Sequence, residues 1–414
     1  MTIASELIDR RAWLKSLAAA GTGTLVSCNK WHPALKPPSD GNWHFDEARL
    51  TSALGTKSLA RPAGVEVMAY NYPAWHPSPW MEERLGKGWT EYKTLRESKT
   101  LFPGHAMPRK PTLGEFNEAD PEWAQREIDL AAKSGITGWM IDWYWHSGTM
   151  FFHEQLEQGF LKAPNNGKLK FAVMWANHDW KNYFPASSPE SAPMLITQEY
   201  SVEDCVRAVR YAIDHYFHAP NYWRIGNEPV FAIFDLPGLL KKLGEDTARR
   251  AFDLMREETR KAGFGDLHLQ WSQSGGSMAG KLDRLGFKSA TQYHPFGWTY
   301  GGRPAGGQTP YGEACGISIA KWAETRDKAS VPFFPGCAVG WDDSPRFGAR
   351  SHVVTGRTPD QYERLCRAAR HFVAGQEKKV VFLSSWNEWT EDHVLLPDEE
   401  FGYGYLEGVG RAFE

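Results

Sequence analysis

Eight short apolar segments, separated by longer helical patterns, constrain the fold of this chain more than any other feature. They are rich in β-branched and aromatic residues and cover residues 65–72, 136–145, 170–177, 229–236, 267–274, 289–296, 331–342 and 379–389. Helical patterns lie between them at 120–135, 201–217, 244–264 and 358–373, and several begin with a capping Asp, Ser or Thr. This alternation predicts an α/β protein with a parallel sheet.

Two α/β architectures fit this alternation, a closed (β/α)8 TIM barrel and an open, doubly wound sheet. The number of strand segments is eight, as a barrel requires. No G-x-G-x-x-G motif follows the first segment, although that motif is typical of the dinucleotide-binding open sheet. We therefore expect a (β/α)8 barrel as a single domain over residues 61–414.

The N-terminal residues have the pattern of an export signal. A twin-arginine pair, Arg10–Arg11, precedes a short and weakly apolar stretch that ends in Leu25, Val26, Ser27 and Cys28. The last four residues resemble a bacterial lipobox, so we expect residues 1–27 to be a signal peptide, residues 28–60 a tether, and Cys28 a lipid anchor. This predicts an exported bacterial lipoprotein in the periplasm or on the cell surface. The alternative is a cytosolic amphipathic N-terminus.

Charge and composition narrow the possible ligands. The formal net charge is −3, which provides no basic field for nucleic acid. The 19 tryptophans indicate either grooves that bind flat, amphipathic ligands such as sugars, or a large aromatic core. The chain has no CxxC, HExxH, P-loop or G-x-S-x-G motif. His215 and His218 have no third metal ligand nearby, so neither a metal nor a cofactor is expected.

Polar and aromatic residues gather at the ends of the strand segments, whose first halves are plainly apolar. In a barrel, active-site residues project from the carboxyl ends of the strands and from the loops that follow them. These positions therefore predict substrate-binding residues, with structural packing or hydrogen bonding as the alternative for each. The candidates are Tyr72, His76, Asp142, Trp143, Trp175, Asn177, His294, Trp341, Asp342 and Asn387.

Glu388 and Glu391 follow the eighth strand segment and are three residues apart. In a strand they would face opposite ways, but in a helical turn they share one face with Cβ atoms about 5–6 Å apart. Carboxyl groups about 5–5.5 Å apart are typical of retaining glycosidases, and pairs about 6.5–9.5 Å apart of inverting ones. Two such groups also repel, which raises one pKa and keeps one proton available. The alternative is an ordinary solvated helix face.

Residues 386–409, WNEWTEDHVLLPDEEFGYGYLEGV, resemble the C-terminal signature of the glycoside hydrolase family 99-like domain, which includes endo-α-mannosidases and WbsX-type polysaccharide-biosynthesis proteins. Residues 70–80, 86–111, 135–145 and 171–180 resemble the same group. The resemblance implies a (β/α)8 barrel, a carbohydrate substrate and no cofactor.

The resemblance also implies roles for the two acids. Glu388 would remove the proton of the substrate's 2-hydroxyl group, which attacks the anomeric carbon to form a 1,2-anhydro sugar, and Glu391 would protonate the leaving oxygen. Water would then open the epoxide with overall retention. The endo-mannosidases carry His where this chain has Thr390, which puts the mannosidase specificity in doubt.

These observations predict a lipid-anchored glycoside hydrolase that cleaves α-linked glycans with retention. One alternative is a glycosyltransferase-like protein of polysaccharide biosynthesis, although no nucleotide-sugar site is evident. Another is a non-catalytic glycan-binding lipoprotein. Arg109, Arg303 and Arg346 are candidate ligands for anionic substrate groups, but a surface position is the simpler expectation for each.

Overall fold

The computed structural model describes residues 64–413 except for 183, 185–191, 274–275 and 298–305. The predicted signal peptide, the tether with Cys28, and Arg303 lie outside the described residues. No helix in the described part of the chain is long and apolar enough to cross a lipid bilayer.

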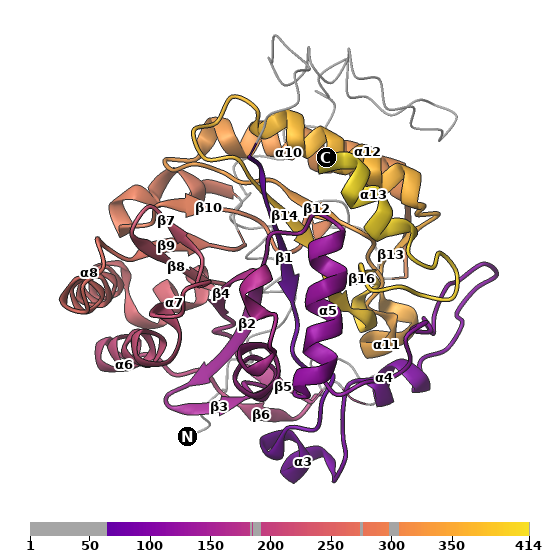
Figure 1. Cartoon of the computed structure of the whole chain (residues 1–414), viewed down its shortest axis with the longest axis horizontal. Coiled ribbons are helices and arrows are strands. Elements are labelled where there is room, and N and C mark those ends of the chain that lie inside the picture. Colours follow the sequence, from indigo (N-terminus) through magenta and orange to yellow (C-terminus); the bar gives the residue numbers. More distant parts are fainter. Residues whose placement is uncertain (1–63, 183, 185–191, 274–275, 298–305, 414) are drawn as a thin grey trace, which may run out of the picture.

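Eight parallel strands form the centre of the molecule (Figure 1). They are β1 (Glu66–Asn71), β2 (Gly138–His146), β4 (Lys170–Trp175), β8 (Glu228–Ile233), β9 (His268–Trp271), β10 (Ser289–Ala290), β12 (Gly336–Ala338) and β14 (Val380–Ser384). From β1 to β10, each of these strands pairs with the next one in this order. Strand β14 pairs with both β12 and β1. The eight predicted strand segments are confirmed.

Backbone hydrogen bonds close the sheet between β10 and the segment leading into β12. The amide of Ala290 donates to the carbonyl oxygen of Pro332 (2.9 Å), and the amide of Phe334 donates to that of Ala290 (2.8 Å). The strands therefore form a (β/α)8-type barrel, as expected. Strand residues such as those of β2 and β14 are buried throughout, which explains their nearly continuous apolar sequence.

Helices surround the strands (Figure 1). The four predicted helical patterns correspond to α5 (Pro121–Lys133), α6 (Val202–Ala212), α8 (Glu245–Lys261) and α12 (Pro359–Val373). Asp120, Ser201 and Thr358 cap three of them by accepting a backbone N–H in the first turn. Three further helices were not predicted from the sequence: α7 (Leu236–Leu243), α10 (Tyr311–Lys328) and α13 (Gly404–Phe413).

The carboxyl ends of the strands continue into short elements that build the site. Helices α3 (Pro79–Leu85) and α4 (Tyr92–Glu97) follow β1, and α11 (Ser344–Phe347) follows β12. Small strands form the pairs β2–β3 (Thr149–Phe151), β5 (Trp180–Lys181)–β6 (Met194–Ile196), β11 (Gln308–Pro310)–β13 (Val353–Thr355) and β15 (Asn387–Glu388)–β16 (His393–Val394). A further small strand, β7 (Arg224–Ile225), pairs with the amino end of β8.

Many of the aromatic residues belong to the core. Fully buried tryptophans include Trp75, Trp139, Trp175, Trp223, Trp322, Trp386 and Trp389, so the large-core explanation of the composition holds for these residues. The four described cysteines, Cys205, Cys315, Cys337 and Cys366, are buried free thiols.

Candidate active site

Glu388 and Glu391 lie on a tight turn just beyond the eighth barrel strand. Glu388 ends the short strand β15, and a single 3-10 turn over Trp389–Glu391 follows it. Asp392 then adopts a left-handed backbone conformation, with φ 54°, and the chain returns along β16. The turn that the three-residue spacing predicts is therefore present, and both carboxyl groups can share one face.

Both carboxyl groups converge on the guanidinium group of Arg346. Its Nη1 contacts Oε1 of Glu391, and its Nη2 lies 3.3 Å from Oε2 of Glu388. Arg346 comes from α11, and its side chain is only 12% exposed, so the expectation of a surface arginine is wrong. Glu388 and Glu391 are 3% and 8% exposed. The pair is therefore buried inside the protein rather than on a solvated helix face.

The two carboxyl groups have opposite preferences for a proton. Burial and the negative charge of Glu391 raise the pKa of Glu388 well above its usual value. Burial acts in the same direction on Glu391, but the Arg346 guanidinium and the contact with His393 outweigh it and lower the pKa of Glu391. The surroundings thus favour a neutral Glu388 and an ionised Glu391.

Tyr293 links Glu388 to Asp142. Its hydroxyl oxygen lies 2.9 Å from Oε1 of Glu388 and 3.0 Å from Oδ2 of Asp142. A tyrosine hydroxyl has one hydrogen, so both contacts are hydrogen bonds only if one of the two carboxyl groups is protonated and donates to the tyrosine oxygen. Burial also raises the pKa of Asp142 well above its usual value. The geometry therefore independently requires at least one proton in this group.

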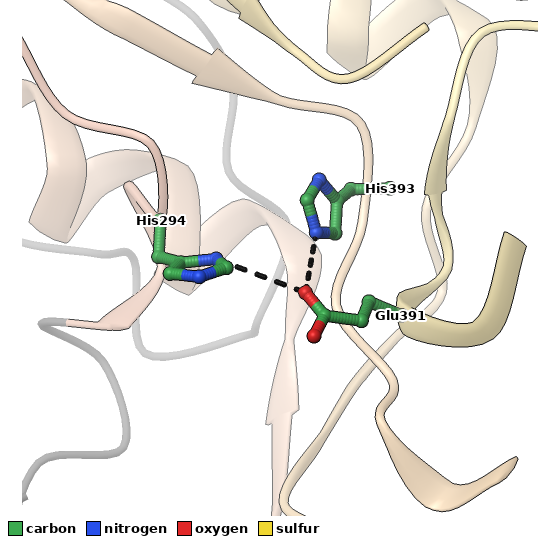
Figure 2. A group of neighbouring side chains, drawn as sticks. All are labelled: His294, Glu391 and His393. Atoms are coloured by element: carbon green, nitrogen blue, oxygen red, sulfur yellow. Dashed lines mark hydrogen bonds and ion pairs between the residues drawn. The ribbon is translucent and has the colours of Figure 1, made fainter. Parts of the chain in front are cut away.

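Two histidines lie against the other oxygen of Glu391 (Figure 2). Nε2 of His393 is 2.9 Å and Nδ1 of His294 is 3.9 Å from Oε2 of Glu391. The ring of Trp341 stacks on that of His393, with centroids 5.5 Å apart. The structure thus brings the predicted residues His294 and Trp341 to the carboxyl pair.

Tyr72 and Glu91 complete the group around Arg346. Glu91 lies just before α4, and its Oε1 accepts hydrogen bonds from Nε (2.8 Å) and Nη2 (2.6 Å) of Arg346. The hydroxyl groups of Tyr72 and Thr390 both donate to Glu91. Thr390, which replaces the histidine of the mannosidases, therefore bonds an internal carboxylate.

Asn387 and Asp342 form hydrogen bonds that help to position the two acids, Glu388 and Glu391. The Asn387 amide nitrogen donates to the carbonyl oxygen of Tyr72 (2.8 Å) and to Glu118 (2.5 Å), and its oxygen accepts from the Tyr72 amide (2.7 Å). The backbone amide of Asp342 donates to the carbonyl oxygen of Glu391 (2.7 Å), and its carboxylate lies 2.6 Å from Nε2 of His105. Both predicted residues therefore bond protein groups next to the pair.

Two predicted tryptophan ligands pack against other parts of the protein. Trp143 and Trp175 are register partners on β2 and β4, and Trp143 lies against Tyr211 of α6. Successive strand residues face opposite sides, so Asp142 faces Tyr293 and the acids while Trp143 packs under the helices. Trp175 is fully buried, with its indole N–H donating to the carbonyl oxygen of Trp145 (2.8 Å).

Two predicted polar ligands are also structural. The Asn177 amide bonds the Tyr200 hydroxyl and both backbone groups of Asp235, which uses its hydrogen-bonding capacity. His76 is buried, with Nε2 3.2 Å from Glu154. Asn177 and His76 therefore both bond other groups of the protein.

Sequence reasoning missed Glu91, Tyr293 and His393, and it favoured a surface position for Arg346. Tyr293 precedes a predicted residue and could have been found from its place after the sixth strand. Glu91 and Arg346 lie in loops with no periodic pattern, so their convergence depends on tertiary structure.

A family model described as glycosyltransferase WbsX matches residues 67–409. Two curated proteins of Xanthomonas campestris pv. campestris, both described as uncharacterized protein WxcX, are 28% identical over 378 residues, which cover 89% of this chain and 52% of each relative. The chain thus spans about half the length of the curated relatives it matches.

Solved structures share the fold. One described as a glycoside hydrolase-like protein has a TM-score of 0.60 at 14% identity, covering 86% of this chain and 95% of that one. Another, described as the GH99 endo-alpha-mannosidase from Bacteroides thetaiotaomicron, has a TM-score of 0.54 at 14% identity, covering 84% and 96%. Identities this low are evidence for the barrel alone.

Proposed function

The chain belongs to the WbsX glycosyltransferase family, and we propose that it is a glycoside hydrolase that cleaves α-linked glycans with retention of configuration. The observation that carries this proposal is the convergence of the two buried acids Glu388 and Glu391 on Arg346 just beyond the carboxyl end of β14. Such a pair supplies one proton donor and one anion, as glycosidic bond cleavage requires. The glycosidase descriptions of the structural neighbours support a carbohydrate substrate.

In this proposal Glu388 is the proton donor and Glu391 is the ionised partner. This reverses the roles that the resemblance implies, because in this chain Arg346 and His393 contact Glu391 while Glu388 faces Tyr293. A carboxylic acid whose pKa is raised by burial is suited to protonate a leaving group near neutral pH.

The proposed reaction proceeds through a 1,2-anhydro sugar. Glu391 accepts the proton of the substrate's 2-hydroxyl group, and that oxygen bonds to the anomeric carbon. The bond from the anomeric carbon to the glycosidic oxygen breaks as Glu388 transfers its proton to that oxygen. Water then adds at the anomeric carbon and opens the epoxide, which restores configuration and returns both protons.

Glycosyl transfer is the second candidate, because the matching family model is described as a glycosyltransferase. A transferase would require an activated sugar donor and would release no reducing ends without it. Incubation of glycans with and without nucleotide sugars separates the two functions.

The dependence of kcat on the leaving group tests the proposal that Glu388 is the proton donor. A panel of α-linked oligosaccharides first identifies a substrate, and the matching glycosyl fluoride then provides a leaving group that needs no protonation. We expect Glu388→Gln to lose at least about 10²-fold in kcat on the glycan, the scale of general acid catalysis, but far less on the fluoride. Glu391→Gln should lose activity on both.

The exposed Glu399→Gln is the matched control and should behave as wild type. If Glu391→Gln, and not Glu388→Gln, is spared on the fluoride, Glu391 is the acid. If Glu388→Gln and Glu391→Gln both keep full activity on the glycan, the proposed hydrolase function is wrong.

A further inference from the structure

One ring nitrogen of each of two histidines and one carboxylate oxygen lie close together beside Trp341. Figure 2 shows the rings of His294 and His393 directed at the same oxygen of Glu391. All three donor atoms lie within 4.8 Å of one another. His294 comes from the loop after β10, whereas Glu391 and His393 come from the turn after β14. Two separate parts of the barrel rim therefore bring the donors together.

We propose that His294, Glu391 and His393 bind a divalent transition-metal ion, with Zn²⁺ as the best-suited example. Two imidazoles and one carboxylate are a ligand set that zinc accepts, with a fourth position left open to water or substrate. Metal–ligand bonds of about 2.0–2.1 Å place tetrahedral ligand atoms roughly 3.3 Å apart. Oε2 of Glu391 lies 2.9 Å from Nε2 of His393 and 3.9 Å from Nδ1 of His294. These distances lie on either side of that value, so a small shift of His294 completes the tetrahedral arrangement.

The charges around this position favour a cation. Glu91 and Glu391 are both buried, and the single guanidinium of Arg346 contacts both of them. Arg346 contacts Oε1 of Glu391, which leaves Oε2 to face the histidines. A buried excess of carboxyl groups is costly unless protons or cations compensate it, and a dication at Oε2 would supply that charge.

The groups around the site leave its donor atoms available to a metal. Arg346 and His393 both contact the Glu391 carboxyl group, which binds a metal in its deprotonated form. His393 is buried, and its Nδ1 has no hydrogen-bond partner among the described residues. Without metal, Nε2 donates its hydrogen to the Glu391 carboxylate. When a metal binds, the ring proton would reside on Nδ1, and Nε2 would present its lone pair to the ion.

Metal binding would inhibit the proposed hydrolysis. The same oxygen of Glu391 cannot hold the ion and accept the substrate's 2-hydroxyl proton. This consequence rests on the proposed function, whereas the site itself does not.

Direct binding measurements on the untagged chain, stripped with EDTA and dialysed, test the site. Titration calorimetry with ZnCl₂ should show one site that weakens at least about tenfold in His393→Gln and in His294→Gln. His215→Gln, which removes an exposed histidine on π-helical residues 213–217, is the matched control and should bind as wild type. Unchanged affinity in folded His393→Gln, checked by circular dichroism, would overturn the site.

Cobalt absorption of the wild-type chain gives a second readout that needs no variant. Co²⁺ in a four-coordinate site of two imidazoles and a carboxylate absorbs strongly in the visible region. A spectrum like that of hydrated Co²⁺ overturns the proposal even if the variants fail to fold. Metal binding without any glycan hydrolysis would leave the site standing and count against the proposed function alone.

Discussion

Arg346 and Glu91 form a buried ion pair, with Nη2 of the arginine 2.6 Å from Oε1 of the glutamate. The same guanidinium contacts Glu388 and Glu391. The arginine thus compensates several buried carboxyl groups, and it fixes the relative positions of the two acids.

Replacing Arg346 by methionine should destabilise the fold strongly. Breaking a buried ion pair costs about 3–5 kcal/mol because it leaves a buried charge without compensation. Urea unfolding at pH 7 measures this loss. Arg249→Met is the control, because Arg249 pairs with Asp246 on the surface, and its effect should stay within about 0.5 kcal/mol. Equal stabilities of the two variants would contradict the compensating role of Arg346.

Glu127 should make stability fall as pH rises. Burial raises the pKa of Glu127 to about 8 from a usual value of 4.5, so the folded state keeps a proton that the unfolded state releases. The contribution of Glu127 to the free energy of unfolding is complete below about pH 4.5. It is lost as pH rises towards 8, by at most about 1.4 kcal/mol per pH unit.

Glu127→Gln removes this proton linkage and retains an acceptor for the indole N–H of Trp386, which lies 2.9 Å from the Glu127 carboxylate. The variant should therefore gain stability relative to wild type between pH 5 and pH 8, measured by urea unfolding at both values. Glu122→Gln, on the exposed side of the same helix, should show no such gain. A constant difference between Glu127→Gln and wild type across this range would show that Glu127 is not protonated in the fold.

Asp392 should hold the turn that carries Glu391. Its carboxylate oxygen Oδ1 lies 2.6 Å from Nε of Arg109 and 2.8 Å from Nη2 of Arg357. Asp392→Asn preserves size and tolerance of the left-handed backbone but removes the charge between two buried arginines. We expect Asp392→Asn to lower the free energy of unfolding by about 3–5 kcal/mol, measured by urea unfolding. Asp246→Asn, at an exposed ion pair, should change little, and a comparable effect there would argue against the buried network.

The fold could be read from the sequence because strand and helix identity is local. Eight apolar segments and four amphipathic patterns correspond to elements of the barrel. Helix α10 was missed because its buried residues include Gly312, Gly316, Ser318 and Thr325, which weaken the apolar pattern.

The site could be predicted only in part. Glu388, Glu391, His294 and Trp341 were found because they follow strand ends, where barrel sites form. Trp143 and Trp175 also follow that rule but face the helices, and the inward or outward direction depends on strand register. Arg346 and Glu91 are 255 residues apart in the chain, so only tertiary structure brings them together.

We also propose that the chain is exported and lipidated at Cys28. Labelling of bacterial cells with radioactive palmitate should mark the wild-type protein and leave Cys28→Ser unlabelled and released from the membrane fraction. The buried Cys205→Ser controls for loss of a thiol. Labelling of Cys28→Ser to the wild-type level would contradict the anchor.

Reducing-end release from a panel of α-linked glycans, followed by NMR of the first product, tests the central claim most directly. The wild-type protein should release reducing ends without a nucleotide sugar, with retained anomeric configuration, and Glu388→Gln should abolish release on those glycans. Release that persists undiminished in both Glu388→Gln and Glu391→Gln, or a first product of inverted configuration, would contradict the account.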